Sequence, residues 1–205
     1  MLWLESTFAL VAVALALALR PWRAFGQAGP PWPWIAACAL LPLVWGADRY
    51  VAMPVAQPLS GASLLLLMMG WPLTVIALVP VALATMWMAG LDAAETLSRA
   101  VWLGLAPATV ALALGAAVRR WLPHHLFVYI LGRGFFVSAA AGIAAGVLSA
   151  WLHPHTGGLA PADVALGRGL AAWGDAWLTG MLVAIFVAFR PEWLATYTDR
   201  LYLPK

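Results

Sequence analysis

Charge is what this chain has least of. Only 9% of its 205 residues are Asp, Glu, Lys or Arg, whereas 64% are hydrophobic. A soluble domain carries about 25% charged residues. A chain with so few charges cannot cover its surface with polar groups. The composition therefore excludes an ordinary soluble domain and predicts an integral membrane protein in contact with a lipid bilayer.

Catalytic motifs and cysteine pairs are also missing. The sequence has no Walker A, GxSxG, HExxH or CxxC pattern. We therefore predict that the chain is not an enzyme and that any ATP hydrolysis coupled to it belongs to another subunit. Its net charge of +3 is spread too thinly for a nucleic-acid partner. The one cysteine, Cys38, cannot form an intrachain disulfide, and we interpret it as a small buried hydrophobe rather than a reactive thiol.

Charges, prolines and glycines divide the chain into seven apolar segments, several of them near the ~20 residues that a membrane-spanning helix needs. The uncharged run from Tyr50 to Leu91 is long enough for two crossings, so we expect two helices joined at Gly70-Trp71-Pro72, with one kinked helix as the alternative. We thus predict an all-α integral membrane protein, a single transmembrane domain over 1–205 with about seven helices. The segments are Phe8–Leu19, Trp32–Trp45, Leu59–Met69, Leu73–Met88, Thr96–Val118, Leu126–Trp151 and Leu170–Phe189.

Basic residues indicate the orientation in the membrane. They follow the first, fifth and seventh segments, and the positive-inside rule makes that side cytoplasmic. The N-terminus would then lie outside and the C-terminus inside. The first segment has no basic residues before it, so we expect an uncleaved helix rather than a signal peptide. The polar, aromatic stretch 191–205 is predicted to be a cytoplasmic interfacial segment that could also dock a partner subunit. The basic residues are Arg20, Arg23, Arg119, Arg120, Arg190, Arg200 and Lys205.

Two charges, Arg133 and Asp175, fall inside predicted helices. Each costs about 2.5–3.5 kcal/mol at a helix centre, so such residues usually face the protein interior. Their predicted depths differ by roughly 10 Å, which an arginine side chain could largely bridge. Either they form an ion pair that locks two helices, or they line a polar substrate pathway. Thr179 lies one turn after Asp175 on the same helical face, where its hydroxyl faces that pathway or bonds its own backbone.

Histidines offer one further candidate. His153 and His155 form an H-x-H pair on the predicted outer side. In an extended chain both imidazoles point to one side and could bind a transition metal, although two ligands make a weak site. His124 and His125 are adjacent, and we interpret them as interfacial residues.

Three stretches resemble the CbiM-like membrane proteins, the substrate-specific components of energy-coupling factor transporters for cobalt and nickel. They read GASLLLLMMGWPL, HLFVYILGRGFFVSA and AWGDAWLTGMLVAIFVAFRPEWLATYTDRLYL. The resemblance covers roughly Gln57 to Leu203 and is greatest to a proteobacterial branch of energy-coupling factor ABC transporter permeases. It implies a seven-helix fold with the N-terminus outside, in the bacterial inner membrane. It also implies ATPase and transmembrane coupling subunits as partners and a divalent transition metal ion as substrate.

The ligands that the resemblance implies are changed in this sequence. The family holds its metal with the N-terminal amine, a His at the second position and a His shortly before a Gly-rich helix start. Here the second residue is Leu2, and Gln57 and Ser60 belong to the stretch where the other His is expected. We therefore count Gln57, with Asp175, Arg133 and Thr179, among the candidate residues of a substrate pathway. The family's acidic residue is kept as Asp175, whereas branch members tend to have Asn near Arg133. We therefore expect either a metal-uptake component with altered ligands or a CbiM-fold protein repurposed as a structural subunit of a larger membrane complex.

Overall fold

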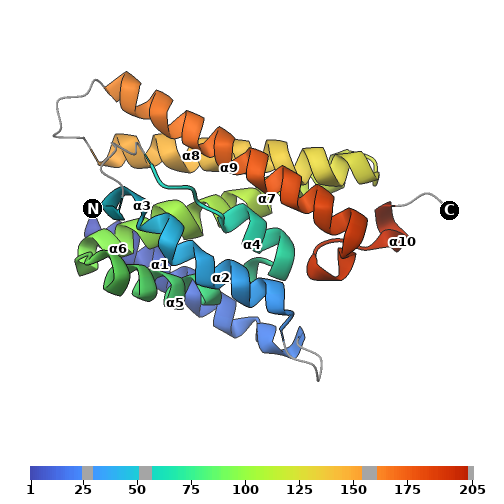
Figure 1. Ribbon diagram of the computed structural model, residues 1–205, viewed down its shortest axis with the longest axis horizontal. Helices are drawn as coiled ribbons and strands as arrows, with labels where there is room; N and C mark the ends of the chain where they lie inside the picture. Colours follow the sequence, from blue (N-terminus) through green and yellow to red (C-terminus); the bar gives the residue numbers. More distant parts are fainter. Residues whose placement is uncertain (25–29, 51–56, 154–160, 203–205) are drawn as a thin grey trace.

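The computed structural model describes residues 1–24, 30–50, 57–153 and 161–202. All regular secondary structure in these ranges is helical and none of it is a strand, which confirms the predicted all-α class (Figure 1). The α-helices are α1 (Leu2–Ala18), α2 (Trp32–Trp45), α3 (Ala47–Tyr50), α4 (Ala62–Met69), α5 (Trp71–Ala89), α6 (Ala93–Arg99), α7 (Ala106–Trp121), α8 (Val137–Leu152), α9 (Pro161–Phe189) and α10 (Asp199–Tyr202). Two 3-10 turns, η1 (Pro21–Ala24) and η4 (Pro191–Trp193), and two π-helical stretches, η2 (Ala100–Leu105) and η3 (Val128–Phe136), complete the set.

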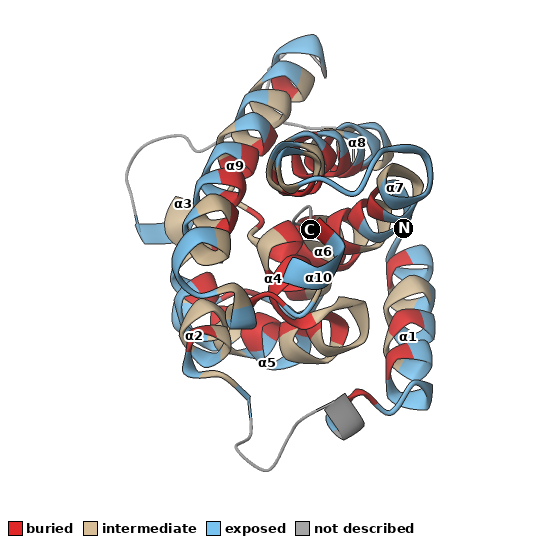
Figure 2. Ribbon diagram, turned by 90° about the vertical axis from the view of Figure 1, so that its right-hand side faces the viewer, coloured by how far each residue is buried: buried red, intermediate tan, exposed pale blue. Residues whose placement is uncertain are grey.

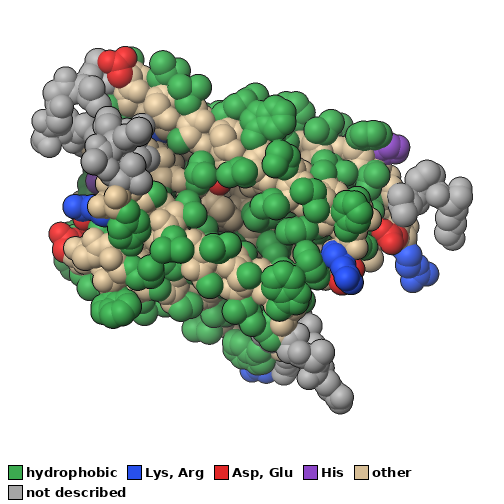
Figure 3. Space-filling view, in the orientation of Figure 1, with side chains coloured by type: hydrophobic (Ala, Val, Ile, Leu, Met, Phe, Trp, Pro, Cys, Tyr) green, Lys and Arg blue, Asp and Glu red, His purple; other side chains and the backbone are tan. Residues whose placement is uncertain are grey.

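Four helical stretches of the described chain are long and apolar enough to cross a membrane: Trp71–Ala89, Ala93–Trp121, Val128–Leu152 and Ala162–Phe189. Helices α1 and α2 are apolar but shorter. The face shown in Figure 3 is hydrophobic along its length, with most of its charged side chains toward the two ends. These features mark the chain as a candidate multi-pass membrane protein. How many of the seven predicted segments cross a membrane, their orientation and which membrane they cross stay predictions.

The two ends of the bundle are called here the α6 end, which includes α3 and α6, and the α10 end, where the chain finishes. Helices α1, α7 and α9 all finish toward the α10 end (Figure 1). At the α6 end, Arg99 joins α6 to α3 by an ion pair with Asp48 at 2.6 Å, and it forms a second ion pair with Glu95 of its own helix at 2.8 Å. The hydrogen bond from Arg99 lowers the pKa of Asp48 below its usual value.

Helix α4 differs most from the predicted seven crossings. Its eight residues span about 12 Å, less than half of a ~30 Å hydrocarbon core. Glycines in positive-φ conformations flank it, Gly61 at φ 64° and Gly70 at φ 79°. The predicted break at Gly70 is thus present, but 59–69 does not form a full crossing. Helix α4 contacts α2, α5, α7 and α9, and every residue except Leu64 is buried (Figure 2). It is a half-length helix enclosed by longer ones.

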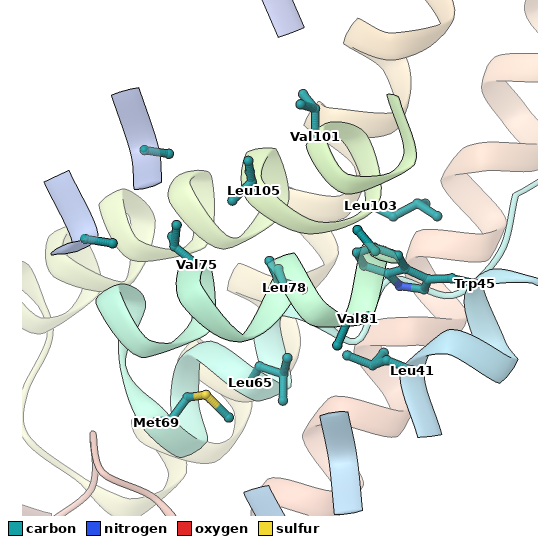
Figure 4. Packing of buried hydrophobic residues seen from close by; sticks show 13 residues of the cluster. Leu41, Trp45, Leu65, Met69, Val75, Leu78, Val81, Val101, Leu103 and Leu105 are labelled. Atoms are coloured by element: carbon teal, nitrogen blue, oxygen red, sulfur yellow. The ribbon is translucent and has the colours of Figure 1, made fainter. Parts of the chain in front are cut away.

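The main hydrophobic core lies beside α4. Trp45 of α2 is fully buried and packs in one cluster with Leu65 of α4, Leu78 of α5 and Leu103 of η2 (Figure 4). Trp45 also donates a hydrogen bond from Nε1 to the carbonyl oxygen of Ser60, at 3.0 Å. The core therefore holds the non-helical backbone that precedes α4.

Candidate functional site

The candidate site lies where the backbone is unwound just before α4. Ser60 Oγ donates to the carbonyl oxygen of Leu103 at 2.6 Å and accepts from the N–H of Ala62 at 3.1 Å. Leu103 belongs to the π-helical stretch η2, and π-bulges occur frequently at functional sites. Non-helical backbone at membrane depth is tolerated only where it is buried in protein or lines a cavity. The bonds of Ser60 and Trp45 meet that requirement here.

Asp175 meets the N-terminal end of α4. It is 7% exposed, and its Oδ1 accepts a hydrogen bond from the N–H of Gly61 at 3.0 Å. The first N–H groups of a helix have no partner within it, and the helix dipole favours negative charge there. Among the described residues, Oδ2 has no hydrogen-bond donor and no cationic side chain pairs with the carboxylate. Asp175 is thus a buried charge balanced only by a backbone N–H and a helix end.

The suggested ion pair between Asp175 and Arg133 is not formed. Of the ion pairs between described residues, none joins the two. Helix α9 begins nine residues before the predicted Leu170, so Asp175 lies near the middle of the helix. Arg133 instead contacts the chain after α9, with Nη1 3.5 Å from the carbonyl oxygen of Thr196. The two charges occupy different sites.

The other predicted pathway residues lie on either side of Asp175. Thr179, 2% exposed, is one turn closer to the α10 end, and the described chain offers its hydroxyl no hydrogen-bond partner. Gln57 lies toward the α6 end, where its Oε1 and the Arg168 side chain both come close to Gly146 of α8. Arg168 is two helical turns, or about 10 Å, from Asp175 along α9. Asp175 and Thr179 therefore form the centre of the site, and Gln57 lies at its edge.

The predicted histidine site is only half described, because His155 lies outside the described residues. His153 Nε2 is 3.2 Å from Glu5 Oε1, and Trp102 Nε1 donates to the same oxygen at 2.6 Å. The histidine thus contacts a buried carboxylate on α1. Within the described parts of the chain, no three His, Cys, Asp or Glu side chains are grouped closely enough to hold a metal ion.

The far end of α4 is also bonded to the chain that follows α9. The N–H of Ala195 donates to the carbonyl oxygen of Met68 at 2.8 Å, and Thr196 Oγ1 donates to that of Leu67 at 2.9 Å. These bonds satisfy carbonyls that a helix end leaves without partners. Asp175 and the C-terminal segment therefore bind opposite ends of one short helix.

Sequence reasoning missed Ser60 and Gly61 as parts of the site. Ser is a frequent residue at helix starts, and Gly readily adopts positive φ. The sequence Ser60-Gly61 before a short apolar run was the available signal for a new helix start inside the protein.

Replacing Ser60 with Ala should lower the free energy of unfolding by about 1–3 kcal/mol, because the buried carbonyl of Leu103 and the N–H of Ala62 lose their partner. The thermal midpoint of the purified protein measures this effect. Ser138→Ala is the matched control, since Ser138 is also buried but its hydroxyl makes only a 3.5 Å contact. Equal losses from the two variants would contradict the role given to Ser60.

No protein-family model matches this chain, and searches among curated proteins and among solved structures find no match. The residues of the site themselves therefore indicate its chemistry. A buried carboxylate and a neighbouring hydroxyl are oxygen ligands of the kind that cations bind.

Proposed function

We propose that this chain is the membrane-embedded, substrate-binding component of a divalent metal uptake system of the CbiM-like type, with Asp175 at its binding site. The observation that carries the proposal is the buried Asp175 carboxylate at the start of a half-length helix. Only a backbone N–H bonds it within the described chain. The resemblance in sequence supports the same function.

Transporter architecture supports this site. Secondary transporters commonly bind substrates and coupling ions near the bilayer midplane, where discontinuous helices expose helix ends and unwound backbone. Helix α4 and the residues before it have this form. Ionisable residues inside membrane proteins are costly, and they commonly mark substrate and ion pathways. A bound cation would offset the cost of burying Asp175.

The donor atoms favour a particular kind of cation. Nickel and cobalt suit imidazole ligands, which Leu2 and Gln57 do not supply at the family positions. Carboxylate, hydroxyl and carbonyl oxygens suit harder ions such as Mn²⁺ or Mg²⁺. We therefore propose a divalent metal substrate bound through oxygen, with Asp175 as its charged ligand and Thr179 as a neighbouring donor.

A structural role is the second candidate, and one observation favours it. Asp175 already bonds the start of α4, so it could serve only to fix that helix. The missing family histidines agree with a CbiM-fold protein that has become a subunit of another membrane complex.

Purification in mild detergent followed by identification of co-purifying proteins separates the two functions. The uptake proposal predicts an ATPase and a transmembrane coupling protein bound to the chain. Deletion of residues 199–205 serves as a test of whether the C-terminal segment contributes to that assembly. Recovery of a stable complex that contains no ATPase would instead support the structural role.

A further inference from the structure

Arg133 is a second buried charge without a counter-charge. It is 9% exposed, and among the described residues no carboxylate forms an ion pair with it. Its Nη1 lies 3.5 Å from the carbonyl oxygen of Thr196, and its guanidinium carbon lies 5.4 Å from the centre of the Tyr129 ring. Its Nε is buried and has no hydrogen-bond partner in the part of the chain that the structure describes.

These contacts do not compensate the charge. Arginine stays protonated in proteins, so Arg133 cannot escape burial by losing its proton. A carbonyl at 3.5 Å is beyond the usual hydrogen-bond distance, and a ring face supplies only a weak attraction. Leaving a buried charge uncompensated is strongly destabilising. The buried positive charge of Arg133 would therefore be stabilised by an anion bound beside it.

A second buried polar group, the hydroxyl of Tyr202, lies near Arg133. The hydroxyl of Tyr202 is buried and has no hydrogen-bond partner within the described chain, and the residue is 3% exposed. Tyr202 and Arg133 line one small pocket together with Arg119 and His124, between the end of α7, the start of η3 and α10. The pocket thus combines two guanidinium groups with an unused hydroxyl donor, and none of the described residues that line it is a carboxylate.

The pocket also lies at a position suited to lipid headgroups. It is at the α10 end, where Arg119 and Arg120 finish α7. Next to it, Trp121 and Phe127 are exposed, at 77% and 64%. Aromatic residues of this kind favour the membrane–water interface, and basic pockets between helices at a cytoplasmic surface bind anionic lipid headgroups.

We propose that Arg133, Arg119 and the Tyr202 hydroxyl form a binding site for a phosphate oxyanion, either the headgroup of an anionic phospholipid or free phosphate. Arginine presents its donors in a fork that matches phosphate oxygens. The pocket is narrow, but the Arg119 side chain that lines it is exposed, so a change in the rotamer of Arg119 can admit a phosphate without moving Tyr202. This site is separate from Asp175 and does not depend on the cation-uptake proposal.

The test compares purified proteins in a maltoside detergent, which contains no phosphate. Phosphatidylglycerol or inorganic phosphate is added, with diacylglycerol and sodium chloride as controls lacking phosphate. Native mass spectrometry counts retained lipid, and the thermal midpoint reports stabilisation. The wild type should bind one phosphatidylglycerol per chain, and Arg133→Gln should weaken this at least tenfold. Tyr202→Phe, which removes only the hydroxyl, should weaken it severalfold.

Arg120→Gln is the matched control, because Arg120 lies beside Arg119 but does not line the pocket. It should bind like the wild type. Stabilisation by inorganic phosphate with the same variant pattern would identify free phosphate as the ligand, and binding of phosphatidylglycerol alone would identify a lipid. If neither probe binds, or Arg133→Gln binds both as well as the wild type, the site does not exist. Should Arg133→Gln fail to fold, unchanged binding by Tyr202→Phe would overturn the proposal.

Discussion

Replacing Asp175 with Ala is expected to lower the thermal midpoint of the purified protein by about 5–10 °C, while Asn at the same position should leave it nearly unchanged. Alanine removes the acceptor for the N–H of Gly61, and a hydrogen bond to a charged group contributes about 1.5–3 kcal/mol. In a protein of this size each kcal/mol corresponds to roughly 2–4 °C. Asparagine retains an acceptor oxygen and removes only the charge.

Asp163→Ala is the control for this comparison, since Asp163 belongs to the same helix but is exposed. It should change the midpoint little. Two results would contradict the account of α4. One is an Asp175→Ala protein as stable as the wild type, and the other is an Asn variant as unstable as the Ala variant.

Gly61→Ala is expected to have the second large effect. Gly61 has φ of 64°, a left-handed conformation that costs other residues roughly 1–2 kcal/mol. A Cβ there would lie 2.6 Å from Leu41 Cδ2, and overpacking adds about 1–3 kcal/mol. Gly90 has the same φ with nothing within 4 Å of its Cβ position. Gly90→Ala should therefore lower the free energy of unfolding only by the cost of the left-handed conformation. Chemical or thermal unfolding measures this difference.

The clash with Leu41 can be separated from the backbone strain by a double-mutant cycle. Leu41→Ala alone creates a cavity in the main core and should be destabilising. Combined with Gly61→Ala, it should cost less than the sum of the two single changes, because the added methyl then has room. If the losses in free energy of unfolding of the two single variants simply add in the double variant, Leu41 does not clash with a side chain at position 61.

Most helix positions could be predicted because apolar length is a strong signal in a membrane protein. The predicted segments over 73–88, 96–118 and 126–151 each differ from the observed helices by only a few residues at either end. The segment over 59–69 was misjudged as a crossing. Its apolar content reflects burial among other helices rather than contact with lipid, and composition alone does not distinguish the two environments.

The site was only partly predictable, for a geometric reason. Sequence placed Arg133 and Asp175 inside helices and within reach in depth, but depth does not specify which way a side chain points around the helix. The structure directs Asp175 toward Gly61 and Arg133 toward Thr196. The partners of both are backbone groups, which are present at every position and so leave no mark in the sequence.

Equilibrium metal binding tests the central claim most directly. The wild type and Asp175→Asn, both in detergent, are dialysed against Mn²⁺, Mg²⁺, Co²⁺ and Ni²⁺ in turn, and bound metal is measured by elemental analysis. The account predicts about one divalent ion per wild-type chain, with Mn²⁺ or Mg²⁺ preferred, and none in the folded Asn variant. A folded wild-type protein that binds no metal, or an Asn variant that binds as much as the wild type, would contradict it.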